Sequence, residues 1–264
     1  MEKIIFFGNG PLADYVKATL APYFEIIFHA RRKEDLETVK TIKKSHPDAH
    51  GVLASFGVMI KQDILDIFEP EGILNIHPSL LPKYRGSSPI ETAILNGDQN
   101  FGVSIMNLVL AMDAGPIYYQ TILPVSTELN YNNPDLKFTL YQKLAKTGAN
   151  WLVENLKHLP QPTHQNDSKA TFTQKFDTTM SLLDPIKNTA DELSRQVLAF
   201  QKFPKSKFDF YKKSCIILTA HTSDTSTPVA IKCKDGRYLC IDRLQPAGKK
   251  PMDAKSFLNG YAKN

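Results

Sequence analysis

Three polar residues of different types are spaced so that one acyl-transfer site could be built from them: Asn75, His77 and Asp113. The apolar run over residues 72–77 predicts the end of a buried strand. Because side chains alternate faces along a strand, Asn75 and His77 project to the same side. A proline then ends the pairing, which places His77 at the strand's C-terminal tip, where open α/β sheets bind ligands. Asp113 lies in a glycine-containing loop just beyond another predicted strand.

The chemistry of acyl transfer between two nitrogens explains why these residue types matter. The reaction passes through a tetrahedral oxyanion, which a neutral amide (Asn75) and a charged imidazolium (His77) can stabilise. A carboxylate (Asp113) can orient the ring, favour its protonated form and help to relay protons from an attacking amine. Taken singly, each residue has an ordinary explanation as a turn former or a structural side chain. Their combination with a following Ser-Leu-Leu-Pro run makes the catalytic interpretation the stronger one.

The same residues resemble a family signature. Residues 75–82, NIHPSLLP, with the later Asp113-x-Gly115, are similar to the signature of the formyltransferases that use 10-formyltetrahydrofolate. That superfamily includes methionyl-tRNA, glycinamide ribonucleotide and sugar-nucleotide formyltransferases, and a domain of formyltetrahydrofolate dehydrogenase. The resemblance implies formyl transfer from 10-formyltetrahydrofolate, with Asn75, His77 and Asp113 as catalytic residues and without a metal.

Two further stretches favour the methionyl-tRNA branch. Residues 85–90, RGSSPI, are similar to a motif of the methionyl-tRNA and sugar enzymes and unlike the purine-pathway enzymes. Residues 244–260, which begin LQPAGKKPM, resemble the C-terminal signature of the methionyl-tRNA enzymes. This resemblance implies that the acceptor is the amino group of charged initiator methionyl-tRNA. Two alternatives stay open: a sugar-nucleotide N-formyltransferase with the same donor, and an inactive folate- or RNA-binding protein.

The resemblance also implies which residues contact the two substrates. The expected folate contacts are a strand-to-helix turn, an apolar loop that we expect to be exposed, and the catalytic aspartate: Phe56, Gly57, Val58, Met59, Ser79, Leu80, Leu81, Pro82 and Asp113. The expected tRNA contacts are basic: Arg31, Arg32, Lys205, Lys207, Lys249 and Lys250. Judged without the resemblance, the turn would pack in the core and the last two lysines would form a surface turn. Arg85 could meet a ligand carboxylate or phosphate, or pair within the fold.

One departure from the family bears on tRNA selection. Methionyl-tRNA formyltransferases carry a long basic loop soon after the second strand, which enters the acceptor stem of the tRNA. Here the chain passes from Phe28 almost directly to a predicted helix, and only Arg31, Arg32 and Lys33 stand where the loop would be. Discrimination between initiator and elongator tRNA must be weaker, be achieved otherwise, or not be needed, and the departure favours the sugar-nucleotide alternative.

Composition agrees with an ordinary globular enzyme. The chain has 264 residues, of which 42% are hydrophobic and 22% charged. No apolar run approaches the roughly 20 residues that a membrane span needs. The N-terminus enters a strand without a signal-peptide pattern, and three cysteines without metal-binding spacing suit a reducing compartment. We expect a soluble, cytoplasmic monomer.

The positive charge is concentrated towards the C-terminus. Residues 201–264 contain 13 Lys and Arg against five Asp, a balance of +8, whereas the whole chain carries only +5. A basic terminal domain on a slightly acidic body indicates a polyanionic partner. A lysine-rich surface that serves only solubility would give the same charge.

The order of predicted elements indicates two domains. The N-terminal part alternates between strands (3–8, 25–29, 51–56, 72–77) and helices (12–20, 35–45, 61–68, 89–96), which favours a doubly wound, mainly parallel α/β sheet. Strands at 102–108 and 117–125 and a helix at 137–159 follow. The turn Gly8-x-Gly10 lacks the third glycine of a dinucleotide motif, so we exclude a nicotinamide site.

A smaller domain is predicted at the C-terminus. Residues 159–167 break regular structure, and a helix at 190–200 precedes short strands at 208–211, 214–219, 229–234 and 238–244. Several short strands suit a small barrel, and the resemblance implies that it is OB-like. We therefore expect a catalytic domain at 1–165, a linker at 166–180 and an OB-like tRNA-binding domain at 181–264.

Overall fold

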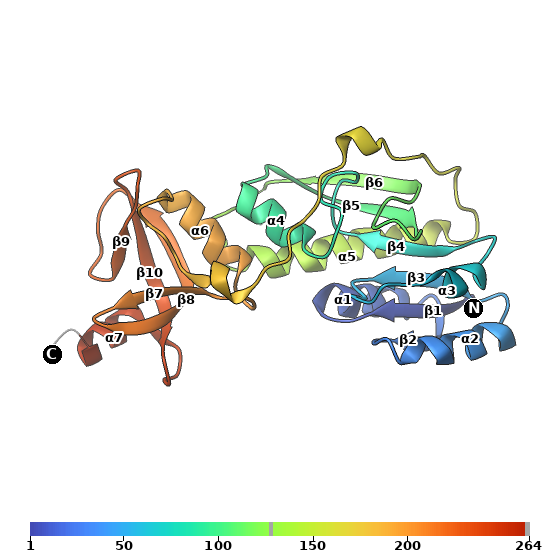
Figure 1. Cartoon of the computed structure of the whole chain (residues 1–264), viewed down its shortest axis with the longest axis horizontal. Helices are drawn as coiled ribbons and strands as arrows, with labels where there is room; N and C mark the ends of the chain where they lie inside the picture. The colour runs from blue at the N-terminus through green and yellow to red at the C-terminus, as the bar shows by residue number, and fades with distance from the viewer. Residues whose placement is uncertain (127–128, 262–264) are drawn as a thin grey trace. The chain divides into compact units, whose positions relative to one another are not determined.

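The computed structural model describes residues 1–126 and 129–261 and divides into two compact units (Figure 1). Unit 1 comprises residues 1–90, 99–125 and 138–174, and unit 2 comprises residues 91–98, 126–137 and 175–264. The roles assigned to residues 1–165, 166–180 and 181–264 stay predictions. In the described part of the chain, no helix is long and apolar enough to cross a membrane.

Unit 1 is built on a six-stranded sheet with the order β2-β1-β3-β4-β5-β6. The strands are β1 (Lys3–Gly8), β2 (Glu25–Ala30), β3 (His50–Ala54), β4 (Ile73–His77), β5 (Asn100–Asn107) and β6 (Ile117–Pro124). The pairings among β1 to β4 are parallel, and β5 and β6 extend the sheet antiparallel. Parallel neighbours need crossover connections, whereas β5 and β6 are joined by the short loop that contains Asp113. The predicted mainly parallel α/β sheet is confirmed.

The helices between these strands are close to the predicted ones. They are α1 (Pro11–Leu20), α2 (Asp35–Ser45), α3 (Gln62–Asp66), α4 (Pro89–Asn96) and α5 (Leu136–Asn155). Helices α3 and α5 end earlier than the sequence predicts. Gly97, expected just after α4, has the positive φ of 71° that closes a helix in this way.

Different helices cover the two faces of the sheet. Ile5 and Phe7 of β1 pack with buried residues of α2 and α3. On the other face, a Cβ added to Gly148 of α5 would lie 2.7 Å from Cγ2 of Ile76, so this helix approaches β4 closely. Because Ile76 faces α5, its neighbours Asn75 and His77 project to the opposite side of the sheet.

Unit 2 contains a curled antiparallel sheet, with the order β11-β10-β8-β7 and with β9 paired to β10 (Figure 1). Its elements are α6 (Ala190–Ala199), β7 (Ser206–Phe210), β8 (Lys213–Ser223), β9 (Ala230–Lys232), β10 (Tyr238–Pro246), β11 (Met252–Asp253) and α7 (Ala254–Tyr261). Leu193 and Val197 of α6 pack in one core with residues of the sheet and with Phe257 of α7. The sequence predicts neither β11 nor α7, because one is two residues long and the other contains helix-weakening Asn and Gly.

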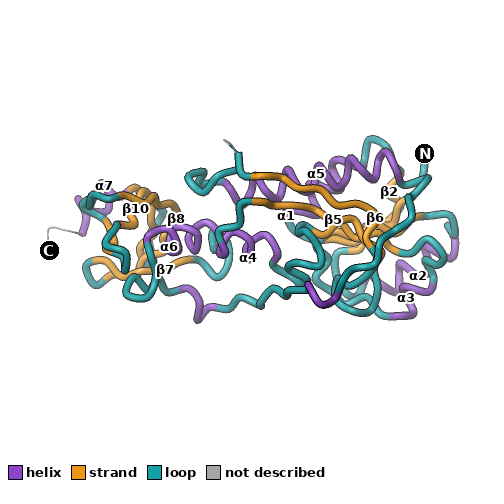
Figure 2. The backbone as a smooth tube through the Cα atoms, turned by 90° about the horizontal axis from the view of Figure 1, so that it is seen from above, coloured by secondary structure: helices purple, strands orange, loops and turns teal. Residues whose placement is uncertain are grey.

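A long connection joins α5 to α6. Residues 156–189 contain two short 3-10 helices, η1 (Asp167–Lys169) and η2 (Thr178–Ser181), and are otherwise loop (Figure 2). The irregular structure predicted for 159–167 is therefore present. The first part of this connection belongs to unit 1 and makes specific hydrogen bonds there, which are described below.

Candidate active site

Asn75 and His77 lie at the C-terminal end of β4, as their spacing predicts. Every residue of β4 is buried, and Asn75 and His77 are each only 4% exposed. The strand is central in the sheet, with β3 on one side and β5 on the other. Both polar side chains therefore need partners within the protein or in a ligand.

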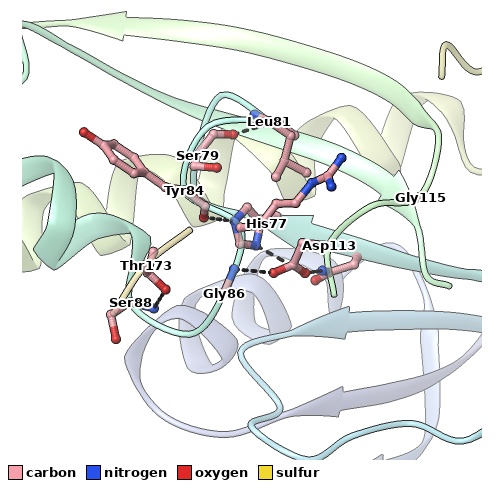
Figure 3. Close-up of polar contacts among 12 residues, drawn as sticks. His77, Ser79, Leu81, Tyr84, Gly86, Ser88, Asp113, Gly115 and Thr173 are labelled. Carbon is pink, nitrogen blue, oxygen red and sulfur yellow. Dashed lines mark hydrogen bonds and ion pairs between the residues drawn. The ribbon is translucent and has the colours of Figure 1, made fainter. Parts of the chain in front are cut away.

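The structure brings Asp113 to these two residues (Figure 3). The Asn75 side-chain amide donates a hydrogen bond to Oδ1 of Asp113 at 3.3 Å, and Nδ1 of His77 lies 3.7 Å from the same oxygen. The backbone N–H of Gly86 donates to Oδ2 of Asp113 at 2.7 Å. All three predicted catalytic residues thus meet at one place, although Asp113 is 38 residues from Asn75.

A backbone carbonyl decides which nitrogen of His77 faces the site. Nε2 of His77 lies 3.0 Å from the carbonyl oxygen of Tyr84 (Figure 3). A carbonyl only accepts hydrogen bonds, so Nε2 carries a proton whether the ring is neutral or charged. Nδ1, beside the Asp113 carboxylate, is therefore the nitrogen that gains or loses a proton. The sequence offered no sign of this contact, which depends on a φ of 62° at Tyr84.

The apolar loop after His77 is not the exposed loop that we expected. Leu81 is 3% exposed, and its backbone N–H donates to Oγ of Ser104 on β5 at 3.1 Å. Ser104 donates in turn to the carbonyl oxygen of Ser79 at 2.6 Å, and Gln120 of β6 donates to the carbonyl oxygen of Leu81 at 2.9 Å. The expectation was wrong because two strands distant in sequence supply polar partners that enclose the loop.

Comparison with known proteins identifies the family to which the chain belongs. Residues 9–156 match the family described as Formyl transferase, and residues 177–262 match Formyl transferase, C-terminal domain. The chain belongs to the formyl transferase family. A curated relative, the methionyl-tRNA formyltransferase of Methylobacillus flagellatus, is 37% identical over 233 residues, which cover 83% of this chain and 73% of the relative.

Solved structures share the fold of this formyl transferase at low sequence identity. The methionyl-tRNA formyltransferase from Clostridium thermocellum has a TM-score of 0.66 at 15% identity and covers 93% of this chain and 98% of its own. HypX from Aquifex aeolicus in complex with tetrahydrofolic acid has a TM-score of 0.70 at 16% identity, covering 100% of this chain and 48% of its own. The family match and the curated relative confirm the enzyme class predicted from Asn75, His77 and Asp113.

The turn expected to line the folate site of this formyl transferase is only partly accessible. Phe56 is 4% exposed and packs in the core of unit 1, and Val58 is half-buried against the same core. Gly57 and Met59 are exposed, with Met59 at 76%. A ligand here could reach Gly57 and Met59 directly, whereas Phe56 would act by supporting the turn. Folate contact at these residues stays a prediction.

Arg85 is paired within the fold, which decides between its two open interpretations. Its side chain is buried, and Nη2 lies 2.6 Å from Oδ1 of Asp167. The same guanidinium donates from Nε and Nη2 to Oε1 of Gln165, at 3.1 and 2.8 Å. A planar guanidinium is suited to such forked contacts. Sequence reasoning missed Gln165 altogether, because it lies in an irregular segment without a recognisable motif.

The basic residues expected to contact tRNA are mostly at the surface. Arg31 and Arg32 are exposed, and their backbone N–H groups both donate to Oδ2 of Asp35, at 2.7 and 3.1 Å. These hydrogen bonds hold the pKa of the Asp35 carboxyl below its usual value. In unit 2, Lys205, Lys249 and Lys250 are exposed and Lys207 is half-buried. The turn after β2, in which Arg31 and Arg32 lie, is therefore short and closed by the Asp35 carboxylate, without an inserted loop.

Within 1–126 and 129–261, no group of three or more His, Cys, Asp or Glu side chains could hold a metal ion. All three cysteines are buried and free. Burial raises the pKa of the Cys215 and Cys233 thiols, which disfavours their reactive thiolate forms.

Proposed function

We propose that this formyl transferase moves the formyl group of 10-formyltetrahydrofolate to the amino group of charged initiator methionyl-tRNA. The observation that carries the proposal is the meeting of Asn75, His77 and Asp113 at the end of β4. Relatives named methionyl-tRNA formyltransferase support the acceptor, and among them the Methylobacillus flagellatus protein is 37% identical. The tetrahydrofolic acid bound to Aquifex aeolicus HypX supports a folate donor.

The proposed reaction assigns a separate task to each catalytic residue. The methionyl amine attacks the formyl carbon, and the carbonyl oxygen becomes an oxyanion that the Asn75 amide and the His77 Nδ1–H stabilise. The 3.7 Å between Nδ1 and Asp113 is longer than a hydrogen bond, so this proton can be donated to the substrate. Asp113 accepts a proton from the attacking nitrogen and returns it to N10 of the folate as the bond between N10 and the formyl carbon breaks.

The donor is proposed to bind between the turn at residues 56–59 and the loop at residues 79–82. A pteridine needs a narrow slot with apolar walls and a few backbone hydrogen-bonding groups. The half-buried Leu80 and the exposed Met59 can supply apolar contact, and the loop backbone is held by Ser104. Calorimetry with tetrahydrofolate tests this: a Met59→Ala or Leu80→Ala variant that bound as tightly as wild type would argue against the placement.

The acceptor is proposed to be held largely by the basic part of unit 2. The excess of lysine and arginine in residues 201–264, with Lys205, Lys249 and Lys250 at the surface, suits contact with phosphates rather than with bases. On this proposal residues 1–165 are catalytic, 166–180 link, and 181–264 bind tRNA. We propose that the enzyme acts as a monomer in the cytoplasm, whose reducing conditions suit its three free cysteines.

A paired formylation assay tests the proposal. The enzyme is incubated with 10-formyltetrahydrofolate and either charged initiator methionyl-tRNA or an aminosugar nucleotide, and the formylated product is measured. We expect turnover on the tRNA and none on the sugar. Turnover on the sugar alone would replace the proposed acceptor, and no turnover on either, despite folate binding, would favour an inactive binding protein.

A further inference from the structure

The segment of residues 163–173, which we call the strap, runs alongside the loops next to the candidate active site and is hydrogen-bonded to them. Thr163 exchanges two backbone hydrogen bonds with Ile117, both 2.8 Å, just beyond the Asp113 loop. Further along, the N–H of Thr171 donates to the carbonyl oxygen of Pro82, and the N–H of Arg85 donates to that of Thr171. In sequence, the strap falls between the two stretches that match the family, residues 9–156 and 177–262. These hydrogen bonds tie the end of the Asp113 loop to the loop that follows His77.

Gln165 is the part of the strap that contacts the catalytic loop directly. Its side-chain Nε2 donates to the carbonyl oxygens of Asp113 and Gly115, each at 2.8 Å. Its Oε1 accepts the two hydrogen bonds from the buried guanidinium of Arg85. Both N–H groups and both oxygen lone pairs of the Gln165 amide are thus used. If the amide were flipped, its NH₂ would face the Arg85 guanidinium and its oxygen would face the two carbonyl oxygens, so only one orientation fits.

The Arg85 side of this network leads back to the same carboxylate. Arg85 is followed by Gly86, whose N–H holds Oδ2 of Asp113 at 2.7 Å (Figure 3). Gly86 has a φ of 119°, and a Cβ there would lie 2.4 Å from Oγ1 of Thr173 on the strap. The strap can approach this closely only because residue 86 is glycine. Asp113 is consequently held through its main chain by Gln165 and through its side chain by Gly86.

The conformation of Asp113 shows why such support is needed. Its φ is 48°, in the left-handed region that costs a non-glycine residue about 1 kcal/mol or more. A residue stays in this conformation only when its surroundings determine it. The carbonyls of Asp113 and Gly115 point at one amide group, so Gln165 sets the turn that aims the carboxylate at Asn75 and His77.

We infer that Gln165 is a positioning residue for formyl transfer, acting on Asp113 through the strap. The inference rests on the proposed function for its reaction, but the structural consequence can be measured without any acceptor. Gln165→Glu keeps the length of the side chain and its pairing with Arg85, while it places a carboxylate oxygen against the two carbonyl oxygens. Gln161→Glu makes the same change on an exposed side chain four residues earlier and serves as the control.

The kinetic test is a double-mutant cycle with Asp113→Asn. We expect Gln165→Glu to lower kcat about 10- to 100-fold, because a misplacement of about 1 Å can cost 100-fold. In the Asp113→Asn background the same change should cost less than about threefold, since there is no carboxylate left to position. Equal losses in both backgrounds, or a kcat within twofold of wild type for Gln165→Glu, would overturn the inference.

Hydrogen–deuterium exchange provides the test that does not depend on the acceptor. Peptides covering residues 84–88 and 111–117 should exchange faster in Gln165→Glu than in wild type or Gln161→Glu, with the rest of unit 1 unchanged. Gln165→Met, which keeps the length and removes both amide functions, replaces the Glu variant if that fails to fold. Unchanged exchange would overturn the inference, whereas faster exchange without tRNA formylation by wild type would fault only the proposed acceptor.

Discussion

Each unit of the molecule contains a histidine beside an aspartate, and the two pairs differ in an instructive way. In unit 2, Nδ1 of His221 lies 2.8 Å from Oδ1 of Asp242, with side chains 55% and 45% exposed. In unit 1, the corresponding distance between His77 and Asp113 is 3.7 Å, with side chains only 6% and 14% exposed. The shorter pair lies on the open surface of a sheet, where water competes for the same atoms.

The two pairs differ in how firmly their groups are held rather than in how close they are. The buried pair has a backbone carbonyl that selects the tautomer, an amide on the carboxylate and a strap that supports the loop. Its groups are held before a substrate arrives, so they can stabilise charge in the transition state without rearranging. A substitution at the His77–Asp113 pair should therefore have a large effect, whereas substitutions among the exposed charges of unit 2 should have small ones.

Removing each histidine in turn is the strongest test of this comparison. His77→Ala should lower kcat by at least about 100- to 1,000-fold, because it deletes a donor to the oxyanion worth roughly 3–4 kcal/mol. His221→Ala should change kcat less than twofold. Both are measured by formylation at saturating donor, with circular dichroism to confirm the fold. A His77→Ala enzyme with near-normal turnover would remove His77 from the mechanism.

The aspartates extend the same test without changing side-chain size. Asp113→Asn should lower kcat by a factor similar to that of His77→Ala, because the amide cannot accept the proton of the amine. Asp242→Asn should be nearly silent. Turnover is measured at constant pH with charged tRNA. Comparable losses in the two variants would mean that burial does not distinguish the pairs.

Two glycines with positive φ, one in each unit, extend the comparison of the two units to packing. Gly86→Ala should lower the free energy of unfolding by about 1–3 kcal/mol and reduce kcat, because it adds strain and contacts Thr173 of the strap. Gly236→Ala in unit 2, with a φ of 81° and no atom within 4 Å of the added Cβ, should show strain alone. Urea unfolding measures both.

Adding Thr173→Ala to Gly86→Ala checks that interpretation, because it removes the hydroxyl nearest the new Cβ. The double variant should regain part of the lost stability. If Gly86→Ala were no more destabilising than Gly236→Ala, the strap would not be packed as tightly as the structure shows.

Each lysine on the surface of unit 2 should contribute little to tRNA binding, and this contribution should depend on the salt concentration. Replacing Lys249 and Lys250 together with Gln should weaken tRNA binding and reduce the slope of log affinity against log salt by up to about two, if both contact phosphates. Lys44 and Lys157, exposed in unit 1, are the matched control pair. Filter binding over a salt series measures the slopes. Equal effects of the two pairs would contradict a localised tRNA surface.

The smallest expected effect concerns the choice of tRNA. Because the Asp35 carboxylate accepts from both N–H groups of the short turn after β2, this turn has no loop to insert into an acceptor stem. The ratio of kcat/KM for initiator over elongator methionyl-tRNA should therefore be lower than that of the Methylobacillus flagellatus relative, assayed in parallel. An equal or higher ratio would show that another part of the chain reads the initiator.

Much of this molecule follows from its sequence alone. The period of apolar residues and the position of turn formers predict β1 to β6, the intervening helices and β7 to β10 of unit 2. The sequence also singles out Asn75, His77 and Asp113, which the structure brings together, and their catalytic role stays a prediction. These features depend on local pattern and on chemical necessity, both of which are written in consecutive residues.

Only the tertiary structure decided how the site is held. Arg85 meets Gln165 across 80 residues, His77 selects its tautomer at the carbonyl of Tyr84, and Leu81 is enclosed by Ser104. None of these contacts has a local signature, because backbone carbonyls are present at every position and a glutamine in a loop has no preferred partner. These contacts form only when the folded sheet brings distant loops to one edge. The partner of each residue therefore depends on the fold and not on the residues next to it in sequence.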